Sequence, residues 1–356
     1  MKKLFFLASI CLLTFFVNAQ TEQIENLIKE GVALHDKGNY DEALKKYDKA
    51  LKFNKSNMIA IGEKSYTLMA MKKFDEAISV CKQGIKINPN SNSLKTIYTN
   101  YAYCLEANDE IDEALKIYDE AISKFPDYYQ LYFNKGITLY KTKEDEEAML
   151  CFEKSIMLNP KHASSHNAIG RIQFDNKKNI PALMALCRFL VIEPEGYRAK
   201  ANFSLINKIM SGSSKKTGRN TITINVDSDM LSDTTDIKKE NEFGTAYLLL
   251  AMTGALDLSK ENKKKTEVEL FIGKMETLCS SMAETKKDNY GFYWEYYAPY
   301  FIELKEKKLI KPFAYILHAS SDSKNVKKWI SKNEKLIKKF YQWSSTYKWK
   351  LKKADN

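Results

Sequence analysis

Apolar and small residues recur along the first half of the chain at intervals close to 34 residues. An alanine marks each interval, and an apolar or aromatic side chain follows four positions later. These pairs are Ala43 and Tyr47, Ala77 and Cys81, Ala114 and Tyr118, Ala148 and Phe152, and Ala182 and Leu186. Such a period predicts units that bury their apolar faces only by stacking on one another.

Each interval is typical of two helices joined by a short polar turn. Lys37-Gly38-Asn39 and Asn108-Asp109 mark such turns, and proline closes the second helix of most units because it cannot continue a helix. The units fall at 24–57, 58–91, 95–128, 129–162 and 163–196. The fifth unit has Pro181 early in its second helix and Phe189 at a position that is otherwise small, so we expect it to be distorted.

Three second-helix segments carry a family resemblance: YDEALKKYDKAL at 40–51, FDEAISVCKQGI at 74–85 and IDEALKIYDEAI at 111–122. They resemble the tetratricopeptide repeat (TPR). The resemblance implies an all-α fold, a right-handed α-solenoid of five helix-turn-helix repeats. Residues 197–210 continue the apolar period and are expected to cap the solenoid, which gives a domain from 20 to 210.

The N-terminus predicts export. Lys2 and Lys3 precede an apolar run from Leu4 to Val17, and Val17-Asn18-Ala19 supplies a small-residue cleavage site. We therefore expect residues 1–19 to be a signal peptide and the mature protein to be periplasmic or secreted. An uncleaved N-terminal anchor is the alternative, but the run is shorter than the roughly twenty residues that span a membrane.

The second half predicts a separate, smaller α-helical domain at 240–356 behind a linker at 211–239. Within the linker, residues 221–226 are typical of either a short strand or an ordered loop. We expect helices near 240–257, 262–285, 291–309, 311–319 and 323–350. Eight of the twelve residues from Tyr290 to Phe301 are aromatic. This favours a buried helix, with an exposed patch for a partner as the alternative.

The net charge of +11 belongs to the second half. Residues 20–196 carry 24 basic and 26 acidic side chains, whereas residues 197–356 carry 30 basic and 19 acidic. Lysine outnumbers arginine 52 to 4, which disfavours nucleic acid as a partner.

Residues 324–353 hold eleven lysines and one glutamate, with apolar residues at helical spacing. This pattern predicts a basic amphipathic helix. We favour docking of its apolar side on the preceding helices, and peripheral contact with an anionic membrane is the alternative.

Motifs of catalysis are missing from the sequence. It has no G-x-S-x-G elbow, P-loop or G-x-G-x-x-G fingerprint, so we expect neither an enzyme nor a cofactor. An enzyme site within 220–356 remains the least favoured hypothesis. His162 and His166 are four residues apart but lack a third ligand, so no metal site is expected. The cysteines fit no disulfide framework and are expected to be buried.

The resemblance also implies where a partner binds, because first helices of successive repeats line the concave surface in this family. The inward positions include Ile28, Val32, His35, Thr99 and Glu106. The candidate partner-binding residues are Tyr66, Met69, Tyr103, Phe133, Ile137, Tyr140, Asn167, Arg171 and Phe174. Partial burial against neighbouring helices is the alternative for each.

These candidates predict an apolar, aromatic groove that binds a peptide or helix of a partner protein. Its expected hot spots are Tyr66, Tyr103, Phe133, Tyr140 and Phe174. The family's carboxylate clamps use Lys and Asn where this chain has Ile28 and Val32, so we expect that recognition to be absent. The predicted function is an exported interaction scaffold or adaptor. The alternative is an accessory of cell-envelope assembly that contacts anionic membrane.

Overall fold

The computed structural model describes residues 2–211, 214–217, 222–224, 240–257, 259 and 261–349. The fold is all-α, as predicted, apart from one short pair of strands. The chain forms two compact units, Met1–Leu158 and Asn159–Asn356, which are described separately.

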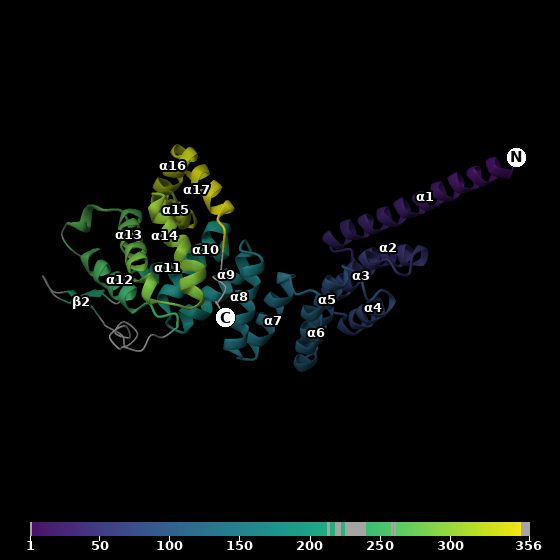
Figure 1. The fold of residues 1–356 in the computed structure, drawn as a ribbon, viewed down its shortest axis with the longest axis horizontal. Coiled ribbons are helices and arrows are strands. Elements are labelled where there is room, and N and C mark those ends of the chain that lie inside the picture. Colours follow the sequence, from purple (N-terminus) through teal and green to yellow (C-terminus); the bar gives the residue numbers. More distant parts are fainter. Residues whose placement is uncertain are drawn as a thin grey trace. The chain divides into compact units, whose positions relative to one another are not determined.

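The first unit consists of four antiparallel helix pairs (Figure 1). Their bounds are α1 Lys2–Asp36, α2 Tyr40–Phe53, α3 Met58–Ala70, α4 Phe74–Ile87, α5 Leu94–Ala107, α6 Ile111–Lys124, α7 Tyr129–Lys141 and α8 Asp145–Leu158. These pairs coincide with the first four predicted repeats. The backbone of α1 is helical from the predicted signal segment into the first repeat, and the signal peptide stays a prediction.

The turn inside each repeat ends the first helix in the same way. The second residue after the helix adopts a left-handed conformation, as at Gly38 (φ 79°) and Asp109 (φ 65°). The next backbone N–H then donates to a leucine carbonyl near the end of the helix, and Glu110 N lies 2.9 Å from Leu105 O. The same bond joins Asn39 to Leu34, Lys73 to Leu68 and Glu144 to Leu139. This Schellman-type closure satisfies carbonyls that the helix leaves free.

Small residues let the two helices of a repeat approach closely. Gly136 on α7 faces the Phe152 ring on α8, and a Cβ added there would lie 2.8 Å from the ring. The recurring alanines and aromatics, among them Ala114 and Tyr118, are buried in the core between the helices. The sequence period therefore reports the packing of each pair.

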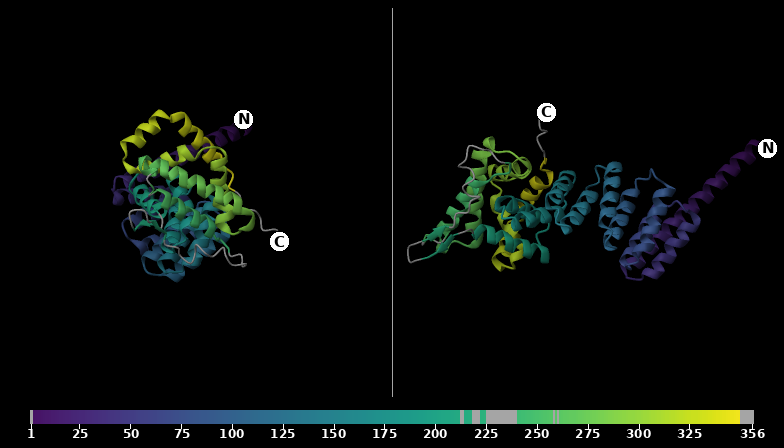
Figure 2. Two further views of the ribbon diagram at one scale, coloured as in Figure 1. Left: turned by 90° about the vertical axis from the view of Figure 1, so that its left-hand side faces the viewer. Right: turned by 90° about the horizontal axis from the view of Figure 1, so that it is seen from below.

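The second unit contains the fifth helix pair and all later elements (Figure 2). Its α-helices are α9 Ala163–Asp175, α10 Asn179–Ile192, α11 Tyr197–Ser211, α12 Gly244–Asp257, α13 Glu267–Thr285, α14 Ala298–Glu306, α15 Ile310–Leu317, α16 Lys324–Lys332 and α17 Glu334–Thr346. A π-helical turn, η5 (Tyr293–Tyr297), precedes α14, and the 3₁₀ turn η6 (His318–Ser321) follows α15.

The division of the chain differs from the one expected, which placed the fifth repeat and residues 197–210 in the solenoid. Every residue of α10 from Ile180 to Val191 is buried, because α10 packs on α9, α11, α12 and α15. Helix α11 packs on α10 and α12 and does not end a stack. Pro181 lies in the first turn of α10, where a missing N–H costs little.

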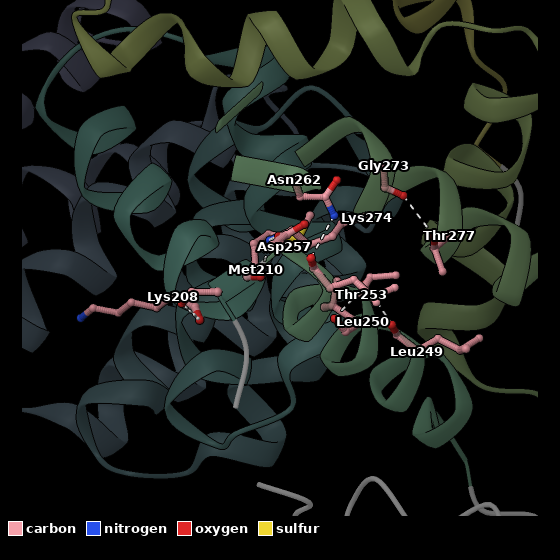
Figure 3. A network of polar contacts seen from close by, with 12 residues as sticks. Lys208, Met210, Leu249, Leu250, Thr253, Asp257, Asn262, Gly273, Lys274 and Thr277 are labelled. Atoms are coloured by element: carbon pink, nitrogen blue, oxygen red, sulfur yellow. Dashed lines mark hydrogen bonds and ion pairs between the residues drawn. The ribbon is translucent and has the colours of Figure 1, made fainter. Parts of the chain in front are cut away.

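A buried lysine ties α11 to the helices that follow it (Figure 3). Lys274 on α13 donates to the carbonyl of Met210, at 2.8 Å, near the C-terminal end of α11. It also pairs with Asp257 at the end of α12, at 2.5 Å. One ammonium group thus joins three helices.

One expectation for the second half needs correction. The single helix expected at 323–350 is two helices, α16 and α17, separated at Asn333. The Asn333 side chain donates to the Trp329 carbonyl at 2.8 Å, and its backbone N–H bonds to the same turn, so the residue ends α16. Residue 350 lies outside the described residues.

The expected linker contains an antiparallel strand pair, β1 (Ser214–Lys216) and β2 (Ile222–Ile224), with Lys215 opposite Thr223. The sequence left a short strand and an ordered loop open for residues 221–226, and the structure has a strand at Ile222–Ile224. The sequence did not indicate its partner, because β1 lies in a Ser/Lys-rich segment. The rest of the linker lies outside the described residues.

Candidate protein-binding surface

The first helices of the first unit follow one another in space. Helix α1 contacts α3, α3 contacts α5, and α5 contacts α7. We call their outward side the first-helix face. It carries three large exposed rings: Tyr66 is 50% exposed, Tyr103 46% and Tyr140 41%. These are three of the nine candidates, and each lies on a different repeat.

Helical geometry makes these rings point outward. Tyr66 stands between buried Ser65 and Thr67, and Tyr103 stands between buried Ala102 and Cys104. Burying those neighbours in the shared core leaves the tyrosine side of each helix uncovered.

Contacts fix the orientation of the first of these rings. The Tyr66 ring stacks on the His35 imidazole at 4.9 Å between centroids. His35 in turn is 2.8 Å from the Thr67 hydroxyl through its Nδ1. A ring held by such contacts loses little conformational freedom when a partner binds.

The other candidates in this unit are half-buried. Met69 packs against the core, and Phe133 lies 5.8 Å from Phe152 between ring centroids. Ile137 is also half-buried. Met69, Phe133 and Ile137 are therefore partly buried, which is the alternative given above for each candidate.

The carboxylate of Glu106 is already engaged at this face. It accepts a hydrogen bond of 2.5 Å from the Thr138 hydroxyl and pairs with Lys141. Both partners lie on α7, so the contacts join consecutive first helices. The exposed surface that remains at Tyr103 and Tyr140 is aromatic.

The fifth-repeat candidates belong to the second unit. Asn167 accepts a hydrogen bond of 2.7 Å from the Asn202 amide on α11. Phe174 is half-buried and Arg171 is exposed.

Comparison with known proteins identifies the repeats. The family described as "Psidin, N-terminal TPR repeats region" matches residues 33–135, and "Tetratricopeptide repeat" matches residues 129–162. The N-terminal segment is a tetratricopeptide-repeat segment.

A stretch of this chain is similar to part of a longer protein. The "Protein STIP1 homolog" of Dictyostelium discoideum is 26% identical over 161 residues, 37% of this chain and 28% of the relative. The match thus spans less than a third of that relative's length.

Two solved structures are similar to part of this chain. PilW, described as a widely conserved type IV pilus biogenesis factor, is 17% identical with a TM-score of 0.45, covering 52% of this chain and 84% of its own. The first TPR of Spaghetti (RPAP3), solved with an HSP90 peptide, is 20% identical with a TM-score of 0.31, and the match covers 34% of this chain and 94% of that structure.

TPR solenoids generally form extended binding surfaces. The tetratricopeptide segment is therefore, by class, a protein-interaction scaffold.

The histidine pair at the start of the fifth repeat is occupied by hydrogen bonds. His166 lies 2.6 Å from the Tyr297 hydroxyl through Nδ1 and 3.0 Å from the Pro160 carbonyl through Nε2. Burial and the nearby Arg188 charge lower the pKa of His166 to about 3, so the imidazole is neutral. Among the described residues, no three His, Cys, Asp or Glu side chains gather as metal ligands.

The aromatic segment beyond the tetratricopeptide repeats is buried. Tyr293, Trp294, Tyr296, Tyr297, Tyr300 and Phe301 are at most 3% exposed. The favoured interpretation of a core helix is therefore confirmed, and an exposed patch formed by these rings is excluded.

The basic segment buries its apolar side. Trp329 stacks on Tyr315 at 3.6 Å, and Trp343 stacks on Tyr300 at 4.8 Å. The Trp343 indole also donates to Glu303 at 2.7 Å. Val326 and Phe340 are buried as well. The apolar side chains that an interfacial helix would insert into lipid are therefore packed against other parts of the protein.

No helix in the described part of the chain is long and apolar enough to cross a membrane.

The sequence did not indicate that two charged residues, Lys274 and Arg188, are buried. For Arg188, the one available signal was a charged residue inside the most apolar segment of the repeats.

Proposed function

We propose that this protein is an exported adaptor that binds a peptide or helix of another protein on its first-helix face. The observation that carries the proposal is the row of half-exposed tyrosines, Tyr66, Tyr103 and Tyr140, on three consecutive first helices. Export rests on the signal-like residues 1–19.

The chemistry of the surface indicates the kind of partner. Tyrosine rings supply large contact area at low entropic cost, and the nearby Glu106 carboxylate is neutralised by Lys141. The partner should therefore present apolar or aromatic side chains at intervals rather than a run of acidic residues. Neither Ile28 nor Val32 supplies a donor for a terminal carboxylate, so an amidated peptide should bind as well as a free one.

A peptide selection tests the proposal without a known partner. A random peptide library is selected on the full chain, and the best binders are measured by calorimetry as free and as amidated peptides. The proposal expects sequences with apolar residues and equal affinity of the two forms. Selected sequences that are mainly acidic, or that require a free carboxyl end, would contradict it.

A second candidate function is electrostatic attachment to an anionic membrane through α16 and α17. Six exposed lysines on these helices have no ion pair among the described residues: Lys324, Lys328, Lys332, Lys335, Lys338 and Lys339. Because the apolar side is docked, attachment would be through charge alone and would weaken with salt.

Vesicle sedimentation tests this candidate. The full chain with Lys332, Lys335, Lys338 and Lys339 changed to Gln should bind phosphatidylserine vesicles several-fold more weakly at low salt. A control with Lys263, Lys264, Lys286 and Lys287 changed to Gln has the same net charge and should bind like the wild type. Equal loss in both variants would show that only net charge matters and would remove the candidate.

A further inference from the structure

Arg188 is a buried cation without a carboxylate. Its side chain, on α10, is 3% exposed. Nη1 donates to the Ser344 hydroxyl at 2.8 Å, while Nε has no hydrogen-bond partner among the described residues. No ion pair to Arg188 occurs among the described residues.

Such an arrangement is costly. Removing a charge from water is unfavourable even after relaxation, and a buried donor without an acceptor adds a further penalty. The guanidinium recovers part of this from two rings, because it lies 5.3 Å from the centre of Tyr300 and 5.0 Å from that of Trp349. Buried orphan donors are rare and call for a physical reason.

One of those rings comes from the C-terminal tail. Helix α17 ends at Thr346, and Trp349 returns to stack on Tyr296 at 4.7 Å and on Tyr300 at 5.0 Å. Tyr347 meets Trp349 edge-on at 5.0 Å. We call Arg188, Tyr296, Tyr300 and Ser344 the Arg188 cradle, and Trp349 its occupant.

The occupant is held mainly by its ring. Trp349 is half-buried, whereas Arg188, Tyr296 and Tyr300 beneath it are almost fully buried. In the described part of the chain, no backbone hydrogen bond ties Lys348 or Trp349 to the helices. Segments with few such bonds open at low free-energy cost.

We propose that the Arg188 cradle is a binding site for a ligand that combines an aromatic ring with a carboxylate, and that Trp349 occupies it in the absence of that ligand. Trp349 supplies the ring but leaves Nε of Arg188 unsatisfied. A ligand with both groups would keep the stacking on Tyr296 and Tyr300 and give the guanidinium a charge-assisted partner. The shared chemistry fits a small aromatic acid or the C-terminal residue of another chain.

Calorimetry on the full chain tests the site, with N-acetyl-tryptophan and its amide as probes. Trp349→Ala should bind the acid about tenfold more tightly than the amide, since only the acid can pair with Arg188. Wild type should bind the acid more weakly than Trp349→Ala, because the tail competes for the cradle. If Trp349→Ala binds neither probe, or both equally, the proposal is wrong.

Two further variants separate the guanidinium from the fold. Arg188→Met in the Trp349→Ala background should lose the preference for the acid while it keeps its helical circular dichroism. Should that variant unfold, Arg188→Lys keeps the charge without the planar fork and should reduce the preference for the acid. A preference that survives in a folded Arg188 variant would overturn the assignment.

Peptides identify the source of the ligand. If a peptide with a C-terminal tryptophan carboxylate binds Trp349→Ala more tightly than N-acetyl-tryptophan, the ligand belongs to a partner chain. The reverse order indicates a small aromatic acid. This site is independent of the first-helix face, so Tyr103→Ala should leave binding of either probe unchanged.

Discussion

The Nδ1 atom of His166 lies 2.6 Å from the hydroxyl of Tyr297, 131 residues further along the chain. The Pro160 carbonyl can only accept, so Nε2 carries the proton and Nδ1 accepts from Tyr297. His166 belongs to the fifth repeat and Tyr297 to the aromatic segment. This bond, with that from the Gln173 amide to the Tyr293 hydroxyl at 2.7 Å, places the fifth repeat in one core with the C-terminal helices.

Burial of the His166 imidazole makes the second unit sensitive to acid. The pKa of His166 falls from 6.5 to about 3 on folding, so the unfolded state binds the extra proton between those values. The contribution of His166 to the free energy of unfolding is fully present above pH 6.5. It falls as the pH drops below that value, by about 1.4 kcal/mol per pH unit for one proton. Burial also lowers the pKa of His162 to about 4, which adds to the slope.

Tryptophan fluorescence can measure the acid effect, because all four tryptophans lie in the second unit. Urea unfolding of His166→Gln between pH 4.5 and 6.5 should show a slope shallower by about one proton. Tyr297→Phe removes the hydroxyl but keeps the imidazole, so its slope should stay near that of wild type. A His166→Gln slope equal to that of wild type would contradict the assigned burial.

Two glycines, one in the second repeat and one in the fourth, should respond to alanine in opposite directions. Gly136→Ala places a Cβ 2.8 Å from Phe152 and should destabilise the first unit by about 1–3 kcal/mol. At Gly62 nothing lies within 4 Å, so Gly62→Ala should stabilise it by about 0.5–1 kcal/mol through helix propensity. Thermal unfolding followed by circular dichroism measures both. The same sign for the two variants would refute the close-packing argument.

Lys274 should be required for the packing of α11, α12 and α13. Lys274→Met leaves the Asp257 carboxylate, only 16% exposed, without its partner and should cost about 3–5 kcal/mol. Adding Asp257→Asn removes the stranded charge and should recover part of the loss. Urea unfolding by tryptophan fluorescence gives the double-mutant cycle. Additive single losses would mean that the two groups do not interact.

The cysteines should resist thiol reagents in the folded chain. Burial raises the pKa of Cys81, Cys104 and Cys279 to about 12 and that of Cys151 to about 11, so little thiolate exists at pH 8. In a Cys11→Ser chain, a disulfide reagent should label these thiols at least tenfold more slowly than after denaturation. Fast labelling of native Cys81 would conflict with the packing described.

The repeats could be predicted because their core is local and periodic. The alanine seen at 114 recurs in every repeat, and an apolar or aromatic residue such as Tyr118 follows it four positions later. The first four repeats also share the leucine before the turn, so one pattern determines helices, turns and burial together. Periodicity alone indicated which residues leave the shared core, and the family resemblance implied that Tyr66, Tyr103 and Tyr140 line one surface. Partial burial at Met69, Phe133 and Ile137 depends on neighbours in space.

Features that join distant segments could not be read from the sequence in this way. Arg188 meets Ser344 across 156 residues, and Lys274 meets Met210 across 64. Neither pairing leaves a local spacing signal. The break at Asn333 depends on one side chain that donates to a carbonyl of its own helix. The lysine-rich amphipathic pattern continues on both sides of Asn333, so it gave no sign of the break.

The affinity of a selected peptide for two matched double variants tests the central claim most directly. Tyr103→Ala/Tyr140→Ala removes two rings from the first-helix face. Phe53→Ala/Leu150→Ala removes apolar side chains of 44% and 66% exposure from second helices of the same unit. Calorimetry should show at least tenfold weaker binding for the tyrosine variant and little change for the control. Equal affinity of the tyrosine variant and the wild type would contradict binding at the first-helix face.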